Sequence, residues 1–540
     1  MNSSDAERER FVLPQWLPFK VAANDRQLSA TNNEAPITQT RASEEAFFAA
    51  RATFWENPSP FIAGDLLGIA LRLGQTAEAK KLAEYVLTQP IAGPIALHIA
   101  GETLGIRSGG VSASLPLQSK IREAKAWLRR FPNDAIAWVE HARLYTIIGQ
   151  KRKAEQVMER GLALAPFDRY IVRAAVRFFI HRGNWDRAHE IAGHAAKRTN
   201  DPWISALWVS TGSQRGTVPS AFKSLFLSAL NAREPFHFAE LLEACATEEV
   251  ITGSEKKAKR AFQQAWIEPP KTVVTHSQWV LREKLPALAT TASIDFSQSA
   301  EAMAWISLMR MDLLGAVQSS REWALEEPYS SNAFLHGSFV DTLREEYTEA
   351  EMLAREGLRA NPGHHGLTNN LAFALVGQNL MGEAAIVMEP LRNEIDRNTD
   401  VALVATWGLL RMKQGAHAEG RGFYVRAIEK AKEQKDPALV LRVVLNYLTA
   451  EMDSGGTVDP VLLSSSADAL AKTSDARIIA TAERLNKRFY ANQSLFPNAQ
   501  EKESLARFDK AVKQSSAELK GLVFAAQKSL PKETDKPAAS

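Results

Sequence analysis

Thiols are scarce in this sequence: Cys245 is the single cysteine among 540 residues. An intramolecular disulfide and a cysteine-based metal site each need more than one thiol, so both are excluded. No window approaches the roughly 18 uninterrupted apolar residues that span a bilayer. The first ten residues are charged and lack the apolar core of a secretory signal. We therefore expect a cytoplasmic protein in a reducing compartment, without contact to a membrane.

A surplus of charge of one sign is also missing. The chain carries 65 Lys and Arg against 62 Asp and Glu, which gives a formal net charge of +3. Proteins built for nucleic acid usually concentrate basic residues, so this balance disfavours that class. A local basic face is still present in the run SEKKAKR at 254–260, which begins a predicted helix. RNA binding through such basic helix faces is therefore the alternative function.

Motifs that carry enzyme chemistry or bind cofactors are absent as well. The sequence contains no GxSxG, no Walker A loop and no GxGxxG. His189 and His194 resemble a zinc motif, but a five-residue step leaves the two rings about 140° apart on a helix. Cys245 lies in an apolar helical segment, where a free thiol acts as a small hydrophobe. We predict a protein that is not an enzyme and needs no metal or cofactor.

Helical periodicity is the dominant pattern that is present. The chain is longer than the roughly 250–300 residues at which a single hydrophobic core stops growing. From about residue 46 to 490, apolar residues recur at helical spacing in segments of roughly 12–15 residues. Gly, Pro and Asn separate these segments, and strand-like alternation is almost absent. The pattern predicts an all-α protein made of many short helices.

The separators repeat with a period of 34 residues. Pairs with this spacing are Pro132 and Pro166, Gly149 and Gly183, Ala154 and Ala188, and Pro328 and Pro362, and Ala316, Ala350 and Ala384 form a run.

A second regularity is a Gly that precedes a small Ala by five residues. It occurs at Gly74 and Ala79, Gly149 and Ala154, Gly183 and Ala188, and Gly253 and Ala258. A Gly at the end of a first helix supplies the positive φ that a tight turn often needs. A small Ala early in the second helix allows the two helices to pack closely. Each such Gly and Ala predicts one helix pair.

These residues resemble the tetratricopeptide repeat (TPR) family, whose signature runs from a Trp through Leu-Gly and Tyr to Ala-x3-Phe and Pro. One unit has Trp138, Tyr145, Gly149, Ala154 and Pro166, with His141 where the family prefers Leu. Another has Ala258 and Phe262 four residues apart, ahead of Pro270. The resemblance implies a superhelical solenoid of antiparallel helix pairs, with first helices lining a concave groove. It implies degenerate repeats that hold a protein or peptide partner.

The chain divides into six expected parts. They are a flexible N-terminal tail over 1–45, TPR-like repeats over 46–269, an irregular bend or degenerate repeat over 270–298, TPR-like repeats over 299–490, a capping helix over 491–530 and a disordered tail over 531–540. The first tail holds an apolar island, Phe11–Val21, in which Pro14 and Pro18 forbid a regular helix. If this island docks in the groove, it acts as an autoinhibitory peptide.

The last helix has an apolar seam. Its members follow a 3,4 spacing at Leu505, Phe508, Val512, Ser515, Leu519, Leu522 and Ala526. A cap on the end of the array is one interpretation, because terminal repeats need a partly polar cover. The other is a coiled coil that forms a homodimer.

Three arginines are the leading candidates for partner binding. Arg143, Arg173 and Arg177 fall on predicted first helices, off the apolar stripe, and the last two share a helix face. Arginine grips carboxylates in a bidentate fork, so the trio predicts an acidic segment in the partner. Asn369 and Asn370 resemble part of the Lys/Asn carboxylate clamp of chaperone-binding family members. The basic residues of that clamp are missing, so the two Asn remain candidates without its function.

Overall fold

The computed structural model describes residues 12–16, parts of 47–104 that include 75–89, and residues 117–285, 288, 294–492 and 498–528 without 234 and 398. Every long regular element in these ranges is a helix, and no strand occurs among them. The predicted all-α class is confirmed. In the described ranges, no helix is both long and apolar enough to cross a membrane.

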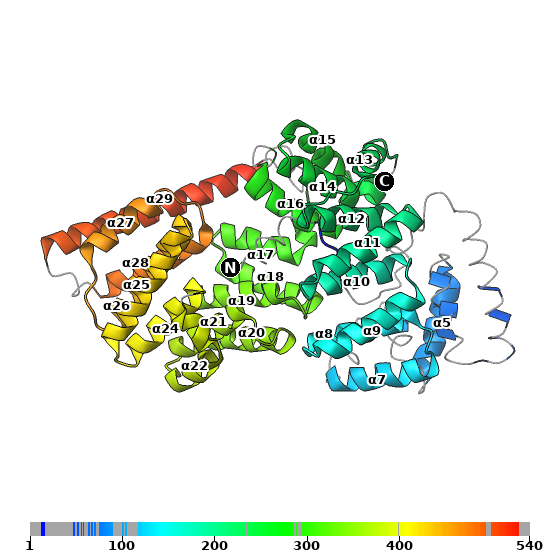
Figure 1. Cartoon of the computed structure of the whole chain (residues 1–540), viewed down its shortest axis with the longest axis horizontal. Helices are drawn as coiled ribbons and strands as arrows, with labels where there is room; N and C mark the ends of the chain where they lie inside the picture. The colour runs from blue at the N-terminus through cyan, green and yellow to red at the C-terminus, as the bar shows by residue number, and fades with distance from the viewer. Residues whose placement is uncertain are drawn as a thin grey trace. The chain divides into compact units, whose positions relative to one another are not determined.

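Two compact units make up the chain: an N-terminal unit within residues 10–273 and a C-terminal unit within residues 274–540. Figure 1 labels the helices of both. The boundary falls inside α16 (Lys271–Trp279), which continues into a π-helical turn at Val280–Lys284. The six-part division expected from the sequence stays a prediction.

Consecutive helices pack as pairs in the N-terminal unit. The helices before the pairs are α5 (Thr76–Thr88) and α7 (Leu117–Arg130). The first helices of the pairs are α8 (Ala135–Ile147), α10 (Arg169–His181), α12 (Pro202–Gln214) and α14 (Pro235–Ile251). The second helices are α9 (Lys151–Leu164), α11 (Trp185–Thr199), α13 (Phe222–Leu230) and α15 (Glu255–Ala265). The short helix α13 differs from the others, because it packs mainly against α14 and less against α12.

Local sequence explains where these pairs begin and turn. The Asp134 and Asp168 carboxylates cap α8 and α10 by accepting from the backbone N–H of Ala137 at 2.9 Å and of Ile171 at 3.0 Å. The turn glycines Gly149, Gly183 and Gly253 have φ values of 70°, 73° and 86°. The alanine five residues after each of them is fully buried. The predicted role of these Gly and Ala positions is confirmed, and Gly74 lies outside the described residues.

The C-terminal unit repeats the pairing. Its first helices are α17 (Ala300–Met309), α19 (Ser331–Leu343), α21 (His365–Gly377), α24 (Val401–Lys413), α26 (Pro437–Asp453) and α28 (Ala476–Ala491). Its second helices are α18 (Leu313–Glu326), α20 (Tyr347–Ala360), α22 (Met381–Met388), α25 (His417–Glu433), α27 (Pro460–Leu470) and α29 (Ala499–Lys528). The short helix α23 (Arg392–Asp396) follows α22.

Three turns of the C-terminal unit use a left-handed residue other than glycine. Met311, Glu345 and Asn379 have φ values of 60°, 63° and 61°. Each stands five residues before a fully buried alanine of the 34-residue run, at Ala316, Ala350 and Ala384. The turn position is therefore the same as in the N-terminal unit, but the sequence pattern of Gly and Ala cannot reveal it.

The two ends of the helix array in the C-terminal unit contact each other. Helix α28, near the end of the array, packs against α17 and α19 at its beginning. Arg484 Nη1 donates to the Thr342 carbonyl oxygen at 2.9 Å, across 142 residues of sequence. One hydrophobic core joins Leu343 of α19 with Leu485 and Phe489 of α28. The helix array of this unit thus closes on itself.

Helix α29 covers α27 and α28, as Figure 1 shows for the end of the chain. Leu505, Phe508, Val512 and Leu519 of the predicted seam are buried in the core of the C-terminal unit. A capping helix places its apolar seam in this way, whereas a dimerising coiled coil would need the same residues exposed. The side chains of Leu522 and Ala526 lie outside the described part.

Candidate functional site

A short piece of the N-terminal tail is docked on the N-terminal unit. Within Val12–Trp16, the side chains of residues 12, 14 and 16 are buried, and those of residues 13 and 15 are partly exposed. Val12 and Trp16 are each only 1% exposed. Burial with a period of two is typical of an extended chain that contacts its support through one side. The rest of the island, Phe11 and residues 17–21, lies outside the described residues.

Two first helices hold this segment. The Trp16 ring meets Phe178 of α10 edge to face, with 5.9 Å between ring centroids and an interplanar angle of 80°. Arg143 Nε of α8 donates to the Trp16 carbonyl oxygen at 3.2 Å. An aromatic contact of this kind adds about 0.5–1.5 kcal/mol beyond the apolar area it buries. The α8 and α10 face therefore accommodates an extended, Trp-containing peptide.

Arg173 of α10 lies in a buried ion pair on the same set of first helices. Its Nη1 and Nη2 donate to the two carboxylate oxygens of Glu240 in α14 at 2.6 and 2.9 Å. The Thr272 hydroxyl also donates to Glu240, and the guanidinium lies 5.2 Å from the Trp203 ring centroid. Arg173 is 7% exposed. The contact links α10, α12, α14 and α16.

The sequence predicts Arg143, Arg173 and Arg177 on first helices, and the structure places all three there. All three side chains are buried: Arg143 is 8% exposed and Arg177 3%. A carbonyl oxygen and a carboxylate of the same chain satisfy Arg143 and Arg173, so neither side chain has to face water. Their role in binding a partner stays a prediction.

Asn369 and Asn370 lie in the other unit, on α21. The Asn370 amide donates to the Ser338 hydroxyl at 2.9 Å and to the Leu335 carbonyl oxygen at 3.2 Å. It therefore joins α21 to α19. The Asn369 Oδ1 atom is buried without a hydrogen-bond partner. Partner binding by Asn369 and Asn370 also stays a prediction. These two residues are on α21, whereas the three arginines are on α8 and α10.

The remaining reactive or basic features have ordinary surroundings. Cys245 is fully buried. Burial raises the pKa of its thiol most, and the negative charges of Glu249 and Glu248 raise it further. A thiol in that state is a poor nucleophile. On α15, Lys256 and Arg260 are exposed, and Lys259 pairs with Glu255 at 2.8 Å.

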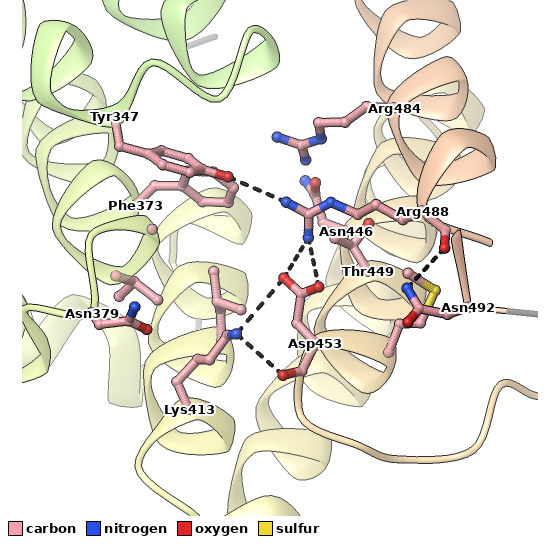
Figure 2. A pocket seen from close by; sticks show the side chains of 14 residues that line it. Tyr347, Phe373, Asn379, Lys413, Asn446, Thr449, Asp453, Arg484, Arg488 and Asn492 are labelled. Carbon is pink, nitrogen blue, oxygen red and sulfur yellow. Dashed lines mark hydrogen bonds and ion pairs between the residues drawn. The ribbon is translucent and has the colours of Figure 1, made fainter. Parts of the chain in front are cut away.

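The C-terminal unit contains a cavity of about 360 Å³. Its lining comes from α21, α24, α26 and α28, and from the start of α20. Figure 2 shows the residues that surround it. Phe373, Leu409 and Met452 supply apolar surface, and Asn446 and Lys413 supply polar surface.

Asp453 pairs with two of the cations that line this cavity, Arg488 and Lys413. Arg488 Nη1 donates to both Asp453 carboxylate oxygens at 2.6 and 2.5 Å. Lys413 Nζ donates to the Asp453 carbonyl oxygen at 3.2 Å and lies 3.8 Å from its carboxylate. Arg488 also donates to Glu345 and to the Tyr347 hydroxyl. Figure 2 draws the contacts of Asp453 with Lys413 and Arg488, and the contact of Arg488 with Tyr347.

Arg484 lines the same cavity but stands outside the network. Its side chain points toward the cavity from α28 in Figure 2. It is 8% exposed, and its pKa is lowered, first by loss of hydration and then by the nearby Arg488 charge. Sequence reasoning missed this residue. The signal was available, because Arg484 and Arg488 are four residues apart, the same spacing that singled out Arg173 and Arg177.

Comparisons with known proteins give one kind of match. No family model matches the chain, and no curated protein matches it. Among solved structures, a chain from "Crystal structure of APC/C hetero-tetramer Cut9-Hcn1" is similar over 90% of this chain and 94% of its own length, at 12% sequence identity and a TM-score of 0.34. A TM-score of this size carries no argument about the fold. The description of the fold as TPR-like rests instead on the helix pairs, turns and buried alanines of this chain.

Proposed function

We propose that this protein is a non-enzymatic scaffold that holds an extended apolar segment of a partner protein on the α8 and α10 first helices. The observation that supports it is the docked segment Val12–Trp16. The concave groove that the TPR resemblance implies is the face on which such a segment would lie.

The contacts suit peptide recognition. Arg143 binds a backbone carbonyl oxygen, which every peptide offers, so this contact positions the chain without reading its sequence. The site of Trp16 against Phe178 selects a large aromatic side chain. Aromatic anchors of this kind often carry most of the binding energy of an interface. The expected partner motif is therefore extended, with apolar residues at alternate positions and a Trp.

The protein's own tail then competes with the partner. A tethered segment has an effective concentration on the order of millimolar when its linker is short and flexible. A partner displaces the tail only when its concentration divided by its own Kd exceeds the tail's effective concentration divided by the tail's Kd. The tail therefore acts as an autoinhibitory peptide. Displacing it should raise the affinity for the partner.

An acidic partner segment is the finer prediction that came from the arginines. To reach Arg173, it would have to replace Glu240, which already binds both nitrogens of the guanidinium fork. An apolar segment needs no such exchange. We therefore favour the apolar segment as the occupant.

The test uses a fluorescent peptide that corresponds to residues 10–21 and the full chain. In the variant Val12→Asp with Trp16→Asp, the tail can no longer dock, because each change would bury a charge. The labelled peptide should bind this variant and should bind the unchanged chain at least tenfold more weakly. The matched control is Phe48→Asp, an exposed aromatic in the same part of the chain. A peptide that ignores the tail variant, or binds all three chains equally, would eliminate the proposal.

RNA binding remains the alternative, and the exposed cations on α15 are the feature that supports it. A titration of the full chain with single-stranded RNA at several salt concentrations separates the two functions. Contact with several phosphates gives a steep loss of affinity with salt. Measurable RNA affinity with that slope, abolished by Lys256→Glu and Arg260→Glu together, would favour the alternative.

A further inference from the structure

Arg484 is a buried cation that forms no ion pair within the described residues. Its Nη1 donates to the Thr342 carbonyl oxygen at 2.9 Å, and its buried Nε has no acceptor. The Glu345 and Asp453 carboxylates lie close enough to raise its pKa, but both of them are paired with Arg488. Removing a guanidinium from water without pairing it costs several kcal/mol. An anion from outside the chain that paired with this guanidinium would lower that cost.

The neighbouring carboxylates are already used. Asp453 forms ion pairs with Arg488 and Lys413, and Glu345 forms an ion pair with Arg488. Three cations therefore face two carboxylates around the cavity, which leaves one positive charge in excess at Arg484. The cavity lies directly beside this charge.

We propose that this cavity binds a small organic anion whose carboxylate or phosphate group pairs with Arg484 and whose apolar part lies against Phe373 and Leu409. A guanidinium fork matches the planar carboxylate and the phosphate alike. The volume of about 360 Å³ belongs to the range of small-molecule sites. This site lies in the C-terminal unit and does not depend on the peptide contacts of the N-terminal unit.

The lining also sets the shape of the ligand. The Arg484 guanidinium carbon lies 5.9 Å from the Phe373 ring centroid, so a flat apolar group can lie along that ring while its anion faces Arg484. Asn446 and Thr449 of α26 line the same cavity and offer hydrogen bonds to a second polar group of the ligand. The ligand expected here carries one anionic group on a compact, partly aromatic body.

Calorimetric titration of the full chain with three matched probes tests this class of ligand. Phenylacetate carries the carboxylate, phenyl phosphate carries the phosphate, and phenylacetamide has the shape of the first without its charge. At least one anion should bind and raise the melting temperature, and the neutral amide should bind at least tenfold more weakly. The stronger of the two anions identifies the class. Equal binding of the amide, or no binding of either anion, would overturn the proposal.

Two substitutions locate the site. Arg484→Met removes the charge and keeps the stem, and it should abolish anion binding. Asn446→Asp adds a carboxylate to the cavity with almost no change of shape, and it should weaken anion binding at least tenfold even if Arg484→Met fails to fold. The matched control is Arg507→Met on α29, an exposed arginine paired with Asp468. Anion binding that survives both cavity variants, or is lost equally in the control, would rule out this site.

Discussion

Two buried arginines of the N-terminal unit and one of the C-terminal unit have different partners. In the N-terminal unit, Arg169 pairs with the Asp201 carboxylate, which caps α12, at 2.5 Å, and Arg173 pairs with Glu240 of α14 at 2.6 Å. In the C-terminal unit, Arg484 donates to a carbonyl oxygen, lies over the Phe373 ring and borders a cavity. A paired cation holds helices together, whereas an unpaired cation beside a cavity is available to a ligand. Burial alone therefore does not separate structural arginines from binding arginines.

The units also differ at their turns. The N-terminal unit places glycine at most of its left-handed positions, as at Gly183, where an added Cβ would touch nothing within 4 Å, and Asn200 at one other. The C-terminal unit also has left-handed glycines, at Gly363, Gly415 and Gly455. It places four residues with a Cβ in this conformation as well: Met311, Glu345, Asn379 and Lys435. Left-handed residues with a Cβ cost roughly 1–2 kcal/mol each relative to glycine in the same conformation. The C-terminal unit therefore stores more backbone strain, and its closed core must offset it.

The largest expected effect is in the paired arginine. Glu240→Ala leaves Arg173 buried without its counter-ion and should destabilise the N-terminal unit by about 3–5 kcal/mol. Replacing both partners, with Arg173→Met and Glu240→Leu, should recover most of that loss, because no charge then remains buried. Denaturant unfolding with a spectroscopic probe in the N-terminal unit measures both. A double variant as unstable as Glu240→Ala would show that the ion pair is not the cause.

The unpaired arginine should behave in the opposite way. Arg484→Met removes a buried charge that forms no ion pair within the described residues, so the free energy of unfolding should change by less than about 1 kcal/mol or rise. The same denaturant experiment, followed in the C-terminal unit, gives the comparison with Glu240→Ala. A loss of about 3 kcal/mol or more would mean that Arg484 is structural, as Arg173 is.

Each unit has a buried histidine whose pKa is lowered. The pKa of His141 is lowered to about 4, mainly by burial and then by the positive charge of Lys125. The pKa of His336 is lowered to about 3, mainly by burial and then by the charges of Arg477 and Arg282. Below the ordinary pKa of 6.5, the unfolded chain binds a proton that the folded chain does not. Stability should therefore be intact above pH 6.5 and fall as the pH drops toward 4, by roughly 2–3 kcal/mol for each histidine.

Removing either histidine tests its share of this pH dependence. His141 stacks on Tyr145 at 4.5 Å between centroids and makes no hydrogen bond through its buried ring nitrogens. His141→Phe should keep the stacking and flatten the pH profile of the N-terminal unit between pH 6.5 and 4. A profile that keeps its slope would assign the acid sensitivity to other groups.

The smallest effects concern the turns. Gly183→Ala should destabilise the N-terminal unit by about 1 kcal/mol through backbone strain alone. Lys435→Gly, at an exposed left-handed position with φ 55°, should stabilise the C-terminal unit by about 0.5 kcal/mol. Thermal unfolding of both variants beside the unchanged chain gives the two signs. Shifts of the same sign would show that glycine use does not distinguish the units.

How far the sequence predicts this molecule depends on how local each feature is. Gly149, Gly183 and their buried alanines follow from a turn of a few residues, so pattern and period suffice to place them. The burial of Arg173 depends on Glu240, 67 residues away, and no local spacing reveals that partner. The position of the Arg484 side chain depends on its hydrogen bond to Thr342, 142 residues away, and on the closure of the array. Side-chain spacing could mark Arg484 and Arg488 as a pair but could not show which of them lacks a carboxylate.

The closure of α28 on α17 and α19 limits how this unit can change in length. An open stack of repeats can gain or lose a helix pair at small cost, because each pair contacts only its neighbours. Here an inserted or deleted pair would move α28 away from Leu343 and Thr342 and separate the single core that joins them. The number of pairs in the C-terminal unit is thus fixed by the need for its ends to meet. Related chains with this unit should vary in their loops and keep the count of helix pairs.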